Sequence, residues 1–215
     1  LVGCGVGAIV ASIIQSSSAT TVMLVGFVDA GLLNLVQAVG VILGANIGTT
    51  ITAQLIAFRI TAYALPAIAA GTFIKFFLGR RAWIYTGDVL LGFGLVFYGL
   101  ATMKAGFAPL NENEWFVSLL ARFHAGNMAG MLLCVLLGTV LTMILQSSSA
   151  TVGITMALAS QGLINFETSV ALILGDNVGT TVTAELAAVG ANINAHRTAR
   201  AHTLFNIIGV FLVIL

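Results

Sequence analysis

Long apolar stretches dominate the chain, and short polar runs interrupt several of them midway. Residues 3–28 hold about 12 apolar residues, then QSSSATT, then about 8 more apolar residues. A helix needs about 20 apolar residues to cross a bilayer, so each arm is too short to cross but can reach its middle. This pattern predicts a re-entrant helical hairpin with the serines at its tip.

The segments that follow predict an all-α membrane protein. Residues 35–58 are apolar but are interrupted by GANIGTT, which predicts a broken transmembrane helix. The same two patterns return near the carboxyl end, as a hairpin at about 126–160 and a broken span at about 166–189. Between and after them we expect helices at about 62–78 and 83–104, a more polar linker at 109–123, and a last helix from about Ala201.

The two hairpin patterns are copies of one sequence. QSSSAT at 15–20 recurs letter for letter at 146–151, and at the same offset of 131 residues GANIGTT meets GDNVGTT. Across residues 15–53, nineteen of 39 positions are identical in the second copy, mostly polar residues and glycines. General hydrophobicity does not produce such identities, so the chain contains an internal repeat. The predicted regions are repeat 1 at 1–60, scaffold helices and linker at 61–125, repeat 2 at 126–190, and a loop with the final helix at 191–215.

The relative orientation of the repeats depends on how QSSSAT enters the membrane. If both copies are re-entrant, three crossings separate them, so the hairpins enter from opposite faces as an inverted repeat. If each copy instead interrupted a full crossing, the repeats would be parallel. The positive-inside rule makes the entry face of the first hairpin cytoplasmic. That face is expected to carry five basic residues, Lys75, Arg80, Arg81, Arg197 and Arg200, against Arg59, Lys104 and Arg122 on the other.

Composition agrees with a lipid environment. Charged residues make up 7% of the 215 residues and the mean hydropathy is +1.09, whereas a soluble domain has about 25% charged residues. A net charge of +1 gives no reason to expect a nucleic-acid partner. Cys4 and Cys134 lack metal-ligand spacing and are expected to be packing residues. Both ends lie inside apolar runs, which suggests a piece of a longer protein.

The repeated polar runs predict one binding centre with two kinds of chemistry. Polar groups at membrane depth are costly unless they line a cavity or bind a partner. Serine and threonine hydroxyls and the N–H groups at a helix start can donate hydrogen bonds to an anion. Side-chain carbonyls and backbone carbonyls of unwound segments suit a hard cation such as Na+. The side-chain carbonyl ligands expected for such a cation are those of Gln15, Gln146, Asn46 and Asn177.

The paired QSSSAT and G(A/D)N(I/V)GTT motifs resemble those of the type II sodium/phosphate cotransporters, over about residues 15–184. The resemblance implies a symporter of the bacterial inner membrane that imports inorganic phosphate with sodium, by alternating access and without an organic cofactor. It implies a substrate site formed by Ser16, Ser17, Ser18, Ser147, Ser148, Ser149, Asn46, Asn177, Thr49 and Thr180. It implies sodium ligands among Gln15, Gln146, Asn46, Asn177, Thr50 and Thr181.

The second copy departs from the first by carrying acids. Asp176 and Glu185 stand where the first copy has Ala45 and Gln54. Asp176 is either a sodium ligand or proton-titrating group, or a solvated or lysine-paired acid. Asp29 near the first hairpin is a second acid whose role stays open. His124, His196 and His202 are expected in loops or at helix ends.

Other function classes remain as alternatives. An intramembrane serine hydrolase would need a base beside its nucleophile, and neither motif contains His or Lys, so we do not expect an enzyme. A passive anion channel, or a sodium-coupled transporter of another oxyanion or a dicarboxylate, would use similar hydroxyl chemistry. A homodimer is compatible with the expected scaffold helices.

Overall fold

The computed structural model describes residues 1–57, 61–78 and 80–215, so Arg59 and Gly79 fall outside the described residues. All regular elements in these ranges are helical, which confirms the predicted all-α class. The α-helices are α1 (Val2–Ile14), α2 (Ser17–Asp29), α3 (Leu35–Ala57), α4 (Ala64–Phe77), α5 (Arg81–Phe107), α6 (Glu114–Arg122), α7 (Met128–Leu145), α8 (Ser148–Ser160), α9 (Phe166–Gly179), α10 (Val182–Ala187) and α11 (Ile193–Ile214), with short 3₁₀ helices at Thr61–Tyr63 and Ala108–Glu112.

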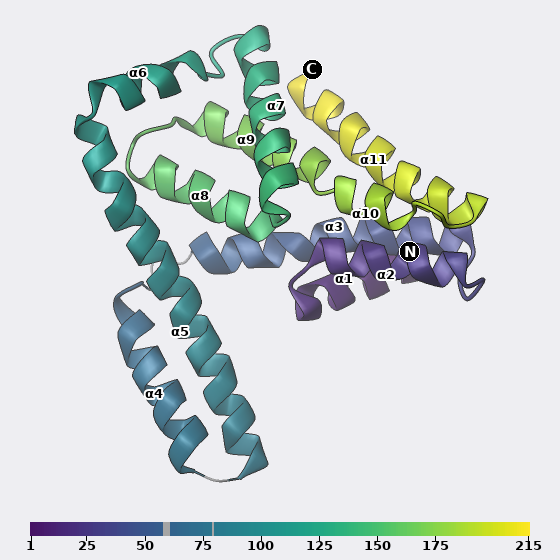
Figure 1. The fold of residues 1–215 in the computed structure, drawn as a ribbon, viewed down its shortest axis with the longest axis horizontal. Coiled ribbons are helices and arrows are strands. Elements are labelled where there is room, and N and C mark those ends of the chain that lie inside the picture. Colours follow the sequence, from purple (N-terminus) through teal and green to yellow (C-terminus); the bar gives the residue numbers. More distant parts are fainter. Residues whose placement is uncertain (58–60, 79) are drawn as a thin grey trace.

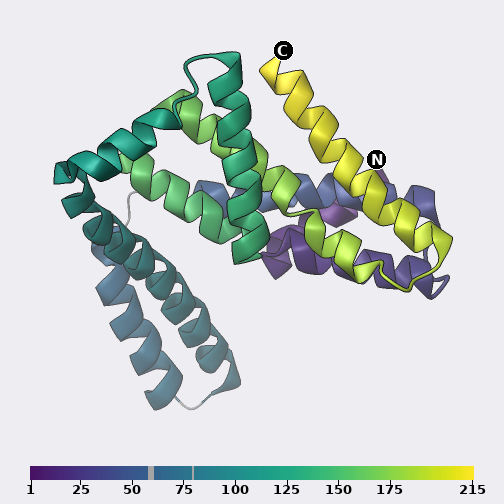
Figure 2. The ribbon, with the colours of Figure 1, turned by 45° about the horizontal axis from the view of Figure 1, so that its top comes forward.

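The helices form two groups and a projecting hairpin (Figures 1 and 2). Helices α1, α2 and α3 lie together with α10 and the first part of α11, while α7, α8 and α9 form the second group. Helices α4 and α5 confirm the two expected uninterrupted helices, and Lys75 of α4 pairs with Asp88 of α5 at 2.7 Å. This hairpin projects away from both groups, but the second half of α5 packs against α8.

Glycines let the first helix of each repeat, α1 or α7, pack directly on the backbone of the third, α3 or α9. A Cβ at Gly7 of α1 would overlap the carbonyl of Val41 in α3. At the same positions of the second repeat, a Cβ at Gly138 of α7 would overlap the carbonyl of Leu172 in α9. The two repeats therefore use the same close helix contact, as small residues allow in membranes.

This packing makes two glycines on one helix respond differently to a methyl group. Gly7→Ala is expected to lower the free energy of unfolding by about 1–3 kcal/mol, because its Cβ would collide with backbone that cannot move aside. Gly5→Ala is the matched control, since a Cβ there meets no atom within 4 Å and alanine favours helix. Thermal unfolding in detergent, followed by circular dichroism, measures both. Equal melting temperatures for the two variants would contradict the packing described.

The predicted break in the first repeat is wrong, because α3 runs through GANIGTT without interruption. Gly44 and Gly48 serve packing there, since a Cβ on either would overlap the backbone of α1. The threonines also stay within the helix, with Thr49 Oγ1 donating to the Ala45 carbonyl at 3.0 Å. The second copy does break: α9 ends at Gly179 and α10 begins at Val182.

The last helix begins earlier than expected, at Ile193, because Asn192 caps it. The Asn192 side chain accepts hydrogen bonds from the backbone N–H groups of Asn194 and Ala195. Its own backbone N–H donates to Asp29 Oδ1 at 2.6 Å, which ties the end of α2 to the start of α11. His202 consequently lies in the middle of α11 and is 0% exposed, so its predicted place at a helix end is wrong.

Helix lengths and surface chemistry suit a bilayer. Within the described ranges, Arg81–Leu110 and Met128–Leu145 are long and apolar enough to cross a membrane. Helices α1 and α2 have 13 residues each, or about 20 Å at 1.5 Å per residue, which is short of the hydrocarbon thickness. Large apolar side chains such as Phe73, Phe76 and Phe77 are exposed on α4. The re-entrant hairpins and the inverted orientation of the repeats stay predictions.

Candidate functional site

The glutamine of each QSSSAT motif adopts an uncommon backbone conformation. Gln15 has φ 57° and Gln146 has φ 54°, the left-handed region, and no other non-glycine residue in the described ranges has positive φ. Each amide Nε2 donates to a carbonyl three residues back, that of Ser12 or Met143, at 2.5 Å. The two turns are thus local copies of each other, and each side chain is held at the end of a helix.

The serine after each glutamine caps the next helix. Ser16 Oγ accepts from the Ala19 N–H at 3.1 Å, and Ser147 Oγ accepts from the Ala150 N–H at 3.3 Å. Helices α2 and α8 therefore begin directly after the two glutamines. Their first N–H groups and positive dipole ends lie beside the serine hydroxyls. Such a combination favours an anion. Ser17 is buried, and Ser16, Ser18, Ser147, Ser148 and Ser149 are partly exposed.

The two repeats meet at a pocket of about 390 Å³, here called the tip pocket. Gln15 enters from the first repeat, and Ser149 and Ala150 from the start of α8 in the second. Helix α5 closes the pocket with the apolar side chains of Val96, Leu100 and Met103, and Gly153 of α8 completes the lining. A predicted cation ligand, Gln15, and a predicted hydrogen-bond donor to the anion, Ser149, are therefore brought together from opposite repeats.

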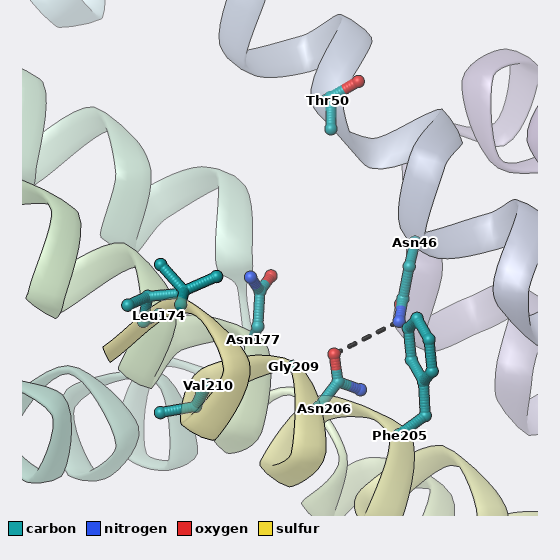
Figure 3. Close-up of a pocket in the computed structure, with 9 residues that line it drawn as sticks. Asn46, Thr50, Leu174, Asn177, Phe205, Asn206, Gly209 and Val210 are labelled. Carbon is teal, nitrogen blue, oxygen red and sulfur yellow. Dashed lines mark hydrogen bonds between the residues drawn. The ribbon is translucent and has the colours of Figure 1, made fainter. Parts of the chain in front are cut away.

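A second pocket of about 250 Å³ gathers side-chain amides and is here called the amide pocket. Asn46 comes from α3, Asn177 from α9 and Asn206 from α11, and their amides face the space between these helices (Figure 3). Asn46 Nδ2 donates to Asn206 Oδ1 at 3.1 Å, and Asn206 Nδ2 donates to the His202 carbonyl at 3.0 Å. Thr50 also lines this pocket, so three of the predicted residues share it.

Several predicted residues line neither pocket. The hydroxyls of Thr49 and Thr180 donate to carbonyls four residues back, and that of Thr181 to the carbonyl three residues back. Gln146 is exposed at its turn. The structure thus divides the single predicted shell into a tip set and an amide set. The binding roles of both sets stay predictions.

Asp176 is buried within the second repeat, 2% exposed, where it accepts a hydrogen bond from Thr142 Oγ1 at 2.9 Å. The solvated alternative for this acid is wrong. The lysine-paired alternative is also wrong, because no lysine in the described part of the chain forms an ion pair with Asp176; Lys75 pairs with Asp88.

Asn206 is a pocket residue that the motif reasoning missed. It lies outside both repeats, in an apolar helix, and its partner Asn46 is 160 residues away in sequence. An amide at membrane depth is itself a signal of function, and this signal was available in the run from Leu204 to Leu215.

Comparison with known proteins identifies the family. The Na+/Pi-cotransporter family matches residues 1–105 and 112–215. The uncharacterised protein YqeW of Bacillus subtilis is 35% identical over 202 residues, covering 94% of this chain and 64% of that protein. YjbB of Escherichia coli, named as a candidate inorganic phosphate export protein, is 30% identical over 212 residues, which cover 98% of this chain and 38% of YjbB.

An animal relative matches part of the chain. The sodium-dependent phosphate transport protein 2C of Rattus norvegicus is 39% identical over 94 residues, which are 42% of this chain and 16% of that protein. The chain spans 64% or less of each of these relatives. No solved structure matches it. Because the family match includes both QSSSAT turns and both GxNxGTT segments, this chain is a membrane protein that belongs to the Na+/Pi-cotransporter family.

Proposed function

We propose that this protein imports inorganic phosphate across the bacterial inner membrane, driven by sodium, through alternating access. The observation that carries the proposal is the tip pocket, where Gln15 of one repeat meets Ser149 of the other beside the start of α8. A site shared by two repeats can open to either side of the membrane as one repeat moves against the other.

The tip pocket supplies the chemistry for phosphate. Hydroxyl groups and first-turn N–H groups donate hydrogen bonds, and the positive end of α8 stabilises negative charge. The other serines of the two turns, Ser16, Ser17, Ser18, Ser147 and Ser148, complete the donors when the anion is bound. The absence of a basic residue from either motif means that another positive charge must balance the anion.

Sodium supplies that charge in our proposal. Asn46 and Asn177 of the amide pocket offer carbonyl oxygens, which hard cations prefer. A cation bound in the low-dielectric interior of the protein lowers the cost of placing phosphate in the tip pocket, which couples the two species. Helices α4 and α5, which project from both groups, would form the scaffold of a homodimer.

The direction of transport follows from the gradient. YjbB is named for phosphate export, whereas the name of the rat relative gives sodium-dependent phosphate transport without a direction. A symporter moves its substrate with the coupling ion, so the inward sodium gradient of a living cell drives import. We therefore expect import under physiological gradients and reversal when the gradient is reversed.

Radiolabelled phosphate uptake into proteoliposomes tests the proposal. An inward sodium gradient is expected to concentrate phosphate inside, and an equal potassium gradient is the matched control. Sulfate, arsenate and a dicarboxylate are offered as competitors in the same assay. Equal flux in sodium and potassium would indicate a passive anion channel, and preferred uptake of a competitor would indicate another substrate.

A further inference from the structure

A buried polar cluster in the second repeat contains an acid that the first repeat lacks at the equivalent position. Thr142 of α7, Thr151 of α8 and Asp176 of α9 converge there, with Thr142 Oγ1 lying 2.9 Å from both Thr151 Oγ1 and Asp176 Oδ1. The three side chains are 1%, 0% and 2% exposed. At the same offset, the first repeat has Ala11, Thr20 and Ala45, which are also buried.

The carboxylate in this cluster lacks a compensating positive charge among the described residues. The ion pair between Lys75 and Asp88 lies elsewhere, in the α4–α5 hairpin. One hydroxyl hydrogen bond does not balance a buried negative charge, since such charges are paired or coordinate cations. Thr142 Oγ1 also lies 2.9 Å from the carbonyl of Gly138, so its single proton serves more than one acceptor.

The oxygen atoms in and around the cluster match a hard cation. The carboxylate and two hydroxyl oxygens come from three different helices, and carbonyl oxygens lie at the edge: Thr142 Oγ1 contacts Gly138 O and Thr151 Oγ1 contacts Ser147 O at 3.3 Å. Oxygen-only ligand sets of this kind suit Na+ rather than a softer metal. Asp176 also lies just before the break between α9 and α10, close to where repeat 2 changes direction.

We propose that Asp176, Thr142 and Thr151 form a sodium site contributed wholly by the second repeat. The site is separate from the amide pocket, which none of the three residues lines. Its cation neutralises Asp176 and ties the first arm of the second hairpin to α8 and α9. The binding of sodium stands by itself, while its part in transport rests on the proposed function. The asymmetry with the first repeat means that one sodium ion has no counterpart there.

The first repeat supplies the variant that tests this site. Replacing Thr142 and Asp176 together by alanine reproduces Ala11 and Ala45, a combination that the same packing already accommodates. Asp176→Asn removes the charge but keeps the size. Thr151→Val is paired with Thr20→Val, which changes the equivalent buried threonine where there is no acid.

Equilibrium binding of radioactive sodium to the purified protein, with choline as the replacement cation, is the readout. We expect the double alanine variant and Asp176→Asn to bind one sodium ion fewer than the unmodified protein, and Thr20→Val to bind the same number. Thr151→Val is expected to weaken sodium binding about tenfold. Size-exclusion profiles and melting temperatures verify that each variant is folded.

Two results separate this site from the proposed function. If folded Asp176→Asn binds as many sodium ions as the unmodified protein, the proposed site is wrong. If this variant also changes the pH dependence of uptake, Asp176 binds a proton and not sodium. Sodium binding that depends on Asp176 in a protein that moves no phosphate would keep the site and reject the proposed function.

Discussion

Gln15→Gly, which removes a side chain that lines the tip pocket, is expected to reduce sodium-driven phosphate uptake by about 10- to 100-fold while the protein remains folded. Gln146→Gly is expected to have a smaller effect, because Gln146 lines neither pocket. The reduction corresponds to the loss of one hydrogen-bonding group that contacts a charged ligand. Glycine adopts the left-handed conformation of both positions without strain, whereas other residues there cost about 1–2 kcal/mol. Initial uptake rates in proteoliposomes, together with melting temperatures, measure the two effects separately.

The control for the glutamines is asparagine, which tolerates positive φ and keeps a shorter amide. Gln15→Asn is expected to retain stability and to recover part of the uptake lost in Gln15→Gly. If the glycine variants transport normally, the glutamines serve only to cap the helix ends through Ser12 and Met143. The strained backbone would then have no role in binding.

Asn206→Leu is expected to lower phosphate uptake about tenfold or more and to weaken sodium dependence. The substitution removes the acceptor for Asn46 Nδ2 and leaves that partly buried donor without its partner. It also replaces a polar wall of the amide pocket by an apolar one of similar size. Uptake measured over a series of sodium concentrations distinguishes a change in maximal rate from a change in sodium affinity.

Asn194→Ala is the matched control on the same helix, because Asn194 is exposed in the first turn of α11 and lines neither pocket. Its uptake should equal that of the unmodified protein. Normal sodium-dependent uptake by Asn206→Leu would exclude the amide pocket from transport, and the sodium ligands would have to be sought elsewhere.

Much of the architecture follows from local pattern. Apolar stretches predicted α4 and α5, and the exact recurrence of QSSSAT predicted two equivalent turns, which Gln15 and Gln146 show with nearly equal φ. Both features depend on neighbouring residues alone. The length of an apolar stretch predicts a helix, and the recurrence of a motif predicts that its local structure recurs.

Other features depend on tertiary contacts that the pattern does not contain. GANIGTT looks like a helix break, but α3 remains continuous through it, although its glycines pack against α1 just as Gly175 and Gly179 of the second copy pack against α7. In the second copy the helix ends at Gly179, so two nearly identical sequences adopt two different backbone structures. Asn206 joins Asn46 across 160 residues, a separation at which sequence spacing predicts no contact. The division of the predicted residues between two pockets has the same origin.

The glycine contacts between α1 and α3, and between α7 and α9, also restrict how the protein can move. Backbone lies against backbone at Gly7 and Gly138, so no side chain can change rotamer to absorb a small sliding step. Each pair must therefore move as one rigid body. Any rearrangement that exposes the sites in turn therefore has to take place outside these two contacts, and the left-handed Gly31 and Gly162 lie at such positions, where each second arm is connected to the helix that follows.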